Sequence, residues 1–103
     1  MDLVSNPSET LIGHVTIEGE FDNDQIGQSF ETAINELISQ GKKKIVIDLS
    51  KTETINSYGI GRIFYMDSKL KEMQGSLVLK GVHGFVREIL DTIKISQLFI
   101  FEE

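Results

Sequence analysis

The 103-residue sequence contains no cysteine and a single proline, Pro7. Without cysteine there is no disulfide, no thiolate metal site and no cysteine nucleophile. Basic residues are also scarce: ten Lys and Arg stand against sixteen Asp and Glu, which gives a formal net charge of −6. This balance argues against nucleic acid or an anionic membrane surface as a binding partner.

Long hydrophobic runs are missing as well. No apolar stretch approaches the roughly 20 residues that cross a membrane. The first residues, MDLVSNPSE, lack the basic and apolar regions of a signal peptide. We therefore expect a soluble, cytoplasmic protein. With 40% hydrophobic and 25% charged residues, the chain fits one globular domain spanning residues 1–103.

The first half of the chain shows a strand pattern followed by a helix pattern. After a short leading segment and Pro7, residues 11–17 alternate with period two, which predicts a half-buried strand that Gly19 ends. Asp22 to Asp24 are good N-cap candidates for the helix that follows. Gly41 is placed to end that helix.

The second half continues the alternation. A nearly continuous β-branched run from Ile45 to Leu49 predicts a central strand covered on both faces. A helix is expected from Ser57 to Met73, a short strand from Ser76 to Lys80 and a last strand from Leu98 to Phe101. Between these strands, a third helix carries an apolar face formed by Phe85, Val86, Ile89, Leu90 and Ile93. The order β-β-α-β-α-β-α-β indicates an α/β domain with a mixed, largely parallel sheet packed with helices.

Few residues could carry catalysis or bind a cofactor. Asp22 and Asp48 could approach the same sheet edge, but helix capping and loop hydrogen bonds explain both more simply. The stretch Gly59 to Gly61 is too short for a dinucleotide fingerprint, and no Lys-Ser/Thr pair completes a P-loop. The two histidines show no metal-ligand spacing. We expect no enzymatic activity, no cofactor and no metal.

Ser57 stands where a strand pattern gives way to a helix pattern. It could be an N-cap, but Asn56 would serve as well, which leaves the Ser57 hydroxyl available for another role. A phosphate is stabilised at a helix N-terminus by free N–H groups and by the helix dipole. The carboxyl ends of strands in α/β folds also commonly expose functional groups. These arguments make Ser57 a candidate phosphorylation site.

Several stretches occur together in an order that resembles a known family. They are GEFD (19–22), IVIDLS (45–50), INSYGIG (55–61), GSLVLKGV (75–82) and VREILDTIKISQLF (86–99). Together they resemble a STAS domain, specifically a bacterial anti-sigma factor antagonist, over residues 11–101. The most distinctive motif, D-S-S/T-G-hydrophobic-G, reads Asn56-Ser57-Tyr58-Gly59-Ile60-Gly61 here.

The resemblance implies a non-enzymatic protein that binds an anti-sigma factor and thereby frees the sigma factor. That partner is typically a serine kinase of the histidine-kinase-like ATPase fold. The kinase would phosphorylate Ser57, and a serine phosphatase would reverse this. Asp22 matches the acid of the family's G-E-L-D segment, which lies near the phosphorylated serine. Two residues depart from the family pattern: Asn56 replaces the usual Asp, and Tyr58 replaces the usual Ser or Thr.

The expected docking surface comprises Asp22, Asn56, Ser57, Tyr58, Gly59 and Ile60. The glycines of the motif are expected to let a partner backbone come close. We expect a monomer or weak dimer. Two other roles of STAS domains stay open: the accessory subunit of an ABC-type lipid transporter, which docks on its ATPase, and a component of a stressosome-type scaffold.

Overall fold

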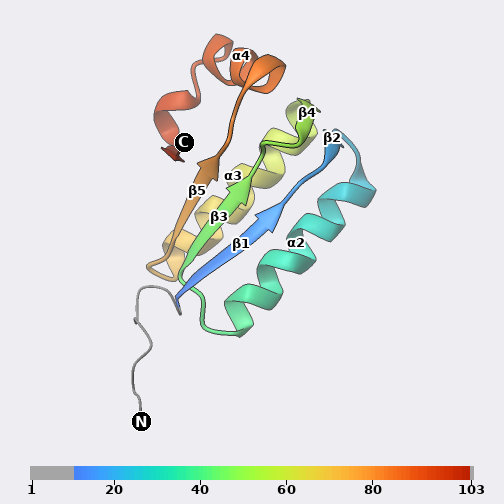
Figure 1. Ribbon diagram of the computed structural model, residues 1–103. Helices are drawn as coiled ribbons and strands as arrows, with labels where there is room; N and C mark the ends of the chain where they lie inside the picture. Colours follow the sequence, from blue (N-terminus) through green and yellow to red (C-terminus); the bar gives the residue numbers. More distant parts are fainter. Residues whose placement is uncertain (1–10, 103) are drawn as a thin grey trace.

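A computed structural model describes residues 11–102, in which strands and helices alternate (Figure 1). The leading segment and the turn expected at Pro7 lie outside the described residues. The elements are β1 (Ile12–Thr16), β2 (Gly19–Phe21), α2 (Asp24–Ser39), β3 (Lys44–Asp48), β4 (Thr52–Ile55), α3 (Ser57–Glu72), β5 (Ser76–Lys80), α4 (Gly84–Thr92), the 3-10 turn η1 (Ser96–Leu98) and β6 (Ile100–Glu102).

Within residues 11–102, four strands form the main sheet in the order β1-β3-β5-β6, and each of these pairings is parallel. Parallel neighbours need a crossover connection, which α2 and α3 supply. The register places Val15 opposite Ile47 and Ile47 opposite Leu79. These side chains are buried in the core against α2 and α3, which lie together on one face of the sheet (Figure 1). The predicted α/β fold with a largely parallel sheet is confirmed.

A second, two-stranded parallel sheet is made by β2 and β4, and the sequence pattern did not predict it. Gly19 was predicted to end the extended chain, but it begins β2 instead. Its φ of 83° turns the chain after β1, and its N–H donates to the carbonyl of Lys51 at 2.9 Å. The buried hydroxyl of Thr52 donates to the carbonyl of Ile17 at 2.7 Å. These bonds hold the short second sheet beside the first.

In the C-terminal part, the buried face of α4 is narrower than the periodicity predicts, and the last strand begins later in the sequence. Val86 and Leu90 of α4 are buried, but Phe85 is 55% exposed and Ile93 is 49% exposed. The reason is that α4 has only nine residues and packs on β4 with Val86 and Leu90 buried and Ile89 partly buried against the core, while Ile93 already stands beyond its last turn. The last strand begins at Ile100 instead of Leu98, because residues 96–98 form the 3-10 turn.

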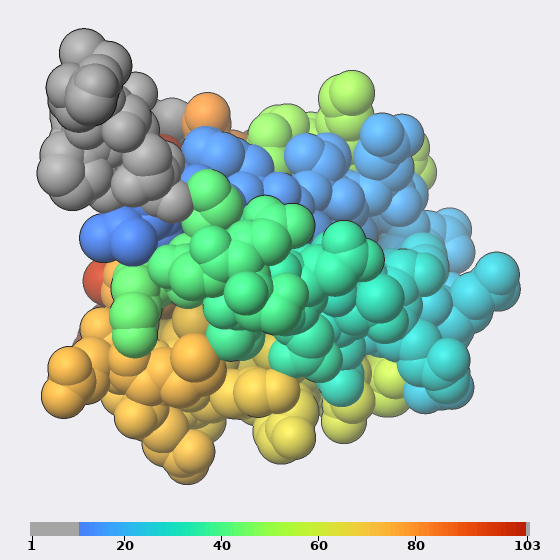
Figure 2. Space-filling view, turned by 90° about the horizontal axis from the view of Figure 1, so that it is seen from below, coloured from blue at the N-terminus to red at the C-terminus, as the bar shows by residue number. Residues whose placement is uncertain are grey.

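The two long helices lie side by side across one layer of the molecule, as the space-filling view shows (Figure 2). Lys69 of α3 donates to Asn35 Oδ1 of α2 at 2.7 Å, and Arg62 of α3 pairs with Glu31 of α2. Both helices start at the carboxyl ends of β2 and β4, which are paired. Their N-termini are therefore neighbours, and the candidate site lies there.

Candidate functional site

Two loops leave the same edge of the small sheet. Because β2 and β4 are parallel with Phe21 opposite Ile55, the residues after each strand emerge together. We call residues 22–24 and 56–58, which comprise the end of each loop and the first residues of the helix after it, the paired loops. Each leads directly into a long helix, α2 or α3. The predicted site residues Asp22, Asn56, Ser57 and Tyr58 are thus brought together by the fold.

Asn56 caps α3. Its Oδ1 accepts from the N–H of Gly59 at 3.1 Å, and its carbonyl accepts from the N–H of Ile60 at 3.0 Å. Ser57 is consequently the first residue of the helix, and its side chain is exposed. The capping bond is made without the Ser57 hydroxyl, because the neighbouring amide already supplies it. An exposed serine therefore stands at the positive end of α3, where a phosphate is favoured.

The first paired loop is capped in the same way. Of the three predicted N-cap candidates the structure selects Asn23, whose Oδ1 accepts from the N–H of Ile26 at 3.2 Å. The Asn23 amide also donates to Asp22 Oδ1 at 3.0 Å. The half-buried Asp22 carboxylate is therefore bonded within its own loop, and it is the Asp22 carbonyl that accepts from Asn56 Nδ2 at 3.2 Å.

Tyr58 is half-buried and faces α2. Its hydroxyl donates to Asp24 Oδ1 at 2.8 Å, and this hydrogen bond raises the pKa of the Tyr58 phenol, with a smaller contribution from burial. The Arg62 guanidinium lies 5.5 Å from the Tyr58 ring centre and 5.6 Å from that of Tyr65. Both distances are within the range of cation–π attraction.

The two motif glycines differ in their surroundings. Gly59 is buried, and a Cβ there would stand 2.3 Å from the carbonyl oxygen of Phe21. The backbone that comes close to Gly59 is thus β2 of this chain, which corrects the expectation that a partner would approach there. Gly61 is exposed, and nothing lies within 4 Å of the Cβ it lacks. Ile60 between them is half-buried and packs against the core.

Asp48 does not join the paired loops. It ends β3, and its Oδ1 accepts from the N–H of Ser50 at 2.8 Å. Hydrogen bonds from Ser50 hold the pKa of the Asp48 carboxyl below its ordinary value. It therefore stabilises the β3–β4 turn, as the explanation of Asp48 by a loop hydrogen bond predicts.

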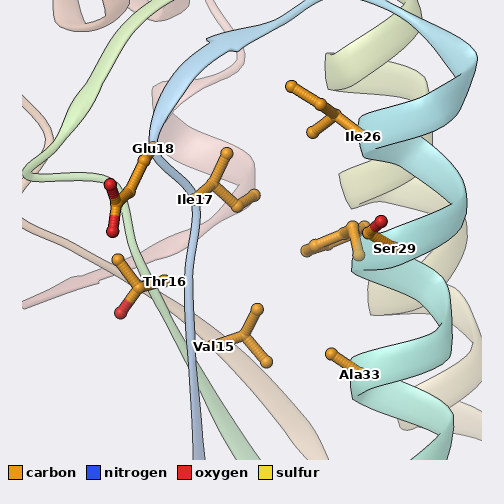
Figure 3. A pocket seen from close by; sticks show the side chains of 8 residues that line it. Val15, Thr16, Ile17, Glu18, Ile26, Ser29 and Ala33 are labelled. Atoms are coloured by element: carbon orange, nitrogen blue, oxygen red, sulfur yellow. The ribbon is translucent and has the colours of Figure 1, made fainter.

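A shallow cleft of about 220 Å³ lies elsewhere, between β1 and α2. Figure 3 shows Val15 and Ile17 pointing into it from β1 and Ala33 from α2, while Thr16 and Glu18 point away. Its lining is thus mainly apolar, and it contains none of the paired-loop residues. In residues 11–102 no three His, Asp or Glu side chains are arranged to hold a metal ion. No helix within that range is both long and apolar enough to cross a membrane.

Three residues around Tyr58 were not anticipated: Asp24 as its acceptor, Gly27 beneath it and Arg62 over its ring. A Cβ at Gly27 would stand 2.4 Å from the Tyr58 hydroxyl oxygen. The signal in the sequence was an isolated glycine inside an otherwise helical pattern, which often has a packing reason. The residue that Gly27 contacts is Tyr58, which lies 31 positions further along the sequence. The pattern alone could not identify it.

The family model described as the STAS domain matches residues 6–103. The chain belongs to the STAS domain family. This confirms the resemblance drawn from the motifs. A curated relative, BtrV from Bordetella bronchiseptica strain RB50, is 25% identical to this STAS domain over 77 residues. The match covers 75% of this chain and 66% of the relative, which is named a "putative anti-sigma factor antagonist".

Solved structures show the same fold. The unphosphorylated anti-sigma factor antagonist SpoIIAA has a TM-score of 0.70 at 16% identity, over 99% of this STAS domain and 84% of that chain. A Thermotoga maritima protein, also named a "putative anti-sigma factor antagonist", has a TM-score of 0.73 at 18% identity, over 87% of this STAS domain and 79% of that chain. A sulfate transporter family protein from Wolinella succinogenes also has a TM-score of 0.73, at 14% identity, over 95% and 80%.

Proposed function

We propose that this STAS domain is an anti-sigma factor antagonist that acts by partner switching in the cytoplasm. It binds an anti-sigma factor kinase of the histidine-kinase-like ATPase fold, and this releases the sigma factor for transcription. The observation that supports the proposal best is the exposed Ser57 at the start of α3, with Asn56 doing the capping. The similarity to BtrV and the shared fold with SpoIIAA agree with it.

The docking surface of the proposal is formed by the paired loops and the first turn of α3. Ser57 is at its centre, flanked by Asn56 and Tyr58, with Asp22 and Ile60 beside them. Gly59 contributes indirectly, because it lets α3 pack on β2. In the unmodified state the surface carries an uncharged hydroxyl at its centre, which a partner can cover at little electrostatic cost.

Phosphorylation of Ser57 is the proposed off switch. A phosphate adds about −1.5 to −2 charges at neutral pH. The helix N-terminus stabilises that charge within the domain, so the fold need not change. At an interface the same charge must be desolvated beside Asp22 and Asp24, which costs several kcal/mol. Because about 1.4 kcal/mol is a tenfold change in affinity, the partner is released. A serine phosphatase restores binding.

The test begins with a pull-down from the native lysate, using the wild type and Ser57→Asp as baits. The protein retained only by the wild type is then purified, and its affinity is measured by calorimetry for the wild type, Ser57→Ala and Ser57→Asp. Incubation with the partner and ATP, followed by mass spectrometry, locates any phosphate. Ser68→Asp is the matched control, since Ser68 is an exposed serine on the same helix.

We expect Ser57→Ala to bind like the wild type and to accept no phosphate, Ser57→Asp to bind at least tenfold more weakly, and Ser68→Asp to bind normally. Equal binding by both Ser57 variants, with no phosphate on Ser57 of the wild type, would contradict the proposal. Retention of a transporter ATPase would favour the accessory-subunit role, with which the transporter-family neighbour is compatible. A large assembly in gel filtration, in place of a monomer or weak dimer, would favour the scaffold role.

A further inference from the structure

Both sequence neighbours of Ser57 are hydrogen-bonded to the same loop. On one side, Asn56 Nδ2 donates to the Asp22 carbonyl at 3.2 Å. On the other, the Tyr58 hydroxyl donates to Asp24 Oδ1 at 2.8 Å. Ser57 therefore lies between two bonds that join the start of α3 to the start of α2.

The Tyr58 bond depends on space that α2 leaves open. Gly27 lies one turn into α2, and a side chain there would collide with the Tyr58 hydroxyl. The Arg62 guanidinium lies over the same ring and is itself paired with Glu31 of α2. Tyr58 is thus in contact with α2 at its hydroxyl end, through Asp24 and Gly27, and with the Arg62 guanidinium over its ring.

The two departures from the family motif supply these two bonds. An aspartate at position 56 keeps the cap oxygen but has no N–H for the Asp22 carbonyl. A serine or threonine at position 58 has its hydroxyl only two bonds from Cα, too near its own backbone to reach across to Asp24. Both unusual residues therefore do the same thing: they join the paired loops.

We infer that Asn56 and Tyr58 are positioning residues, which fix the Asp22–Asp24 loop against α3 and so hold the surface around Ser57 ready for its partner. This inference rests on the proposed function. A surface held in the binding-competent arrangement loses less conformational freedom on docking. When the competent fraction of molecules falls, the apparent dissociation constant rises in proportion. Loss of either bond should therefore raise KM for the partner kinase and leave kcat unchanged.

Three variants break the bonds from different sides. Tyr58→Phe keeps the ring and removes the donor to Asp24. Gly27→Ala displaces the hydroxyl without altering Tyr58 or Asp24, and it replaces a helical glycine with a better helix former. Asn56→Asp keeps the cap and removes the donor to Asp22. Lys69→Met is the matched control, because it removes another α2–α3 hydrogen bond, the one to Asn35, far from Ser57.

The assay is phosphorylation of Ser57 by the partner kinase at varied substrate concentration. Since one hydrogen bond is at stake, we expect KM to rise about three- to tenfold in each of the three variants, with kcat unchanged. Lys69→Met should leave KM unaltered. The inference is overturned if the kinase phosphorylates the wild type and the three variants show the same KM as the wild type. It is also overturned if Asn56→Asp shows a lower KM than the wild type. A wild type that is neither bound nor phosphorylated would instead contradict the proposed function itself, and the inference with it.

A second readout needs no partner. In a Tyr65→Phe background, Tyr58 is the only tyrosine of the chain, so ultraviolet absorbance follows its ionisation alone. The Asp24 bond raises the pKa of Tyr58 above the ordinary value of 10.0. Gly27→Ala should shift the titration back toward that value, and Lys69→Met should not. A Tyr58 pKa at the ordinary 10.0 in the parent Tyr65→Phe protein would show that the hydroxyl lacks the Asp24 acceptor, and that result would also overturn the inference.

Discussion

Alanine substitutions at the two motif glycines should have opposite effects on stability, although the glycines are two residues apart on one helix. At Gly59, the added Cβ would meet the Phe21 carbonyl oxygen at 2.3 Å and the Ile55 side chain at 2.9 Å. The first of these atoms belongs to the backbone of β2 and cannot rotate away. The strand, the helix or both must shift to accommodate the methyl group.

The magnitude follows from two competing terms. Overpacking a dense site costs roughly 1–3 kcal/mol, and a backbone contact this short belongs at the upper end. Replacing a helical glycine with alanine returns about 1 kcal/mol in helix propensity. Gly59→Ala should therefore lose about 2 kcal/mol of unfolding free energy. Gly61→Ala meets nothing within 4 Å, so it should gain about 0.5–1 kcal/mol from propensity alone.

Urea unfolding followed by circular dichroism measures both free energies under one set of conditions. Thermal unfolding should show the same order, with Gly59→Ala melting roughly 10 °C below the wild type and Gly61→Ala a few degrees above it. A Gly59→Ala protein within about 0.5 kcal/mol of the wild type would refute the packing argument. So would a Gly61→Ala protein that is less stable than the wild type.

Two further substitutions test the turn that joins the sheets. Thr52→Val should cost about 1–3 kcal/mol in urea unfolding, because it removes the buried donor to the Ile17 carbonyl, whereas the half-buried Thr54→Val serves as the comparison. Asp48→Asn should be less stable than the wild type at neutral pH, since the folded-state pKa of Asp48 lies below its ordinary 3.8 and the charged form is the stabilising one. That deficit should shrink as the pH falls through the folded-state pKa, below about 4; a melting-temperature difference independent of pH would contradict the role of the charge.

The helix α3 and the strand β5 could be predicted from the sequence, since an apolar helical face sets the first and a continuous apolar run sets the second. The helix predicted from Ser57 to Met73 is observed as Ser57–Glu72, with Met73 as its C-cap. The strand predicted from Ser76 to Lys80 has those bounds. In α3 the buried residues recur with the helical period, whereas in β5 three consecutive residues, Leu77 to Leu79, are buried, as in a strand covered on both faces.

The short elements and the cross-chain contacts could not be predicted in this way. β2 and β4 have three and four residues, too few for a period to emerge, and they exist because they pair with each other. The same holds for Tyr58 and Gly27: the glycine signals a packing contact but not the residue that makes it. The bond from Asn56 Nδ2 to the Asp22 carbonyl likewise could not be predicted, because only the fold brings that carbonyl within reach.

Three contacts between the two halves of this domain share one sequence separation. Residues 22 and 56, 24 and 58, and 35 and 69 are each 34 positions apart. The stretches 24–35 and 58–69 must therefore keep equal length, because losing one residue from either would rotate the rest of that helix by about 100°. Insertions and deletions among homologues should consequently collect in the largely exposed turn at 40–43 and avoid both helices.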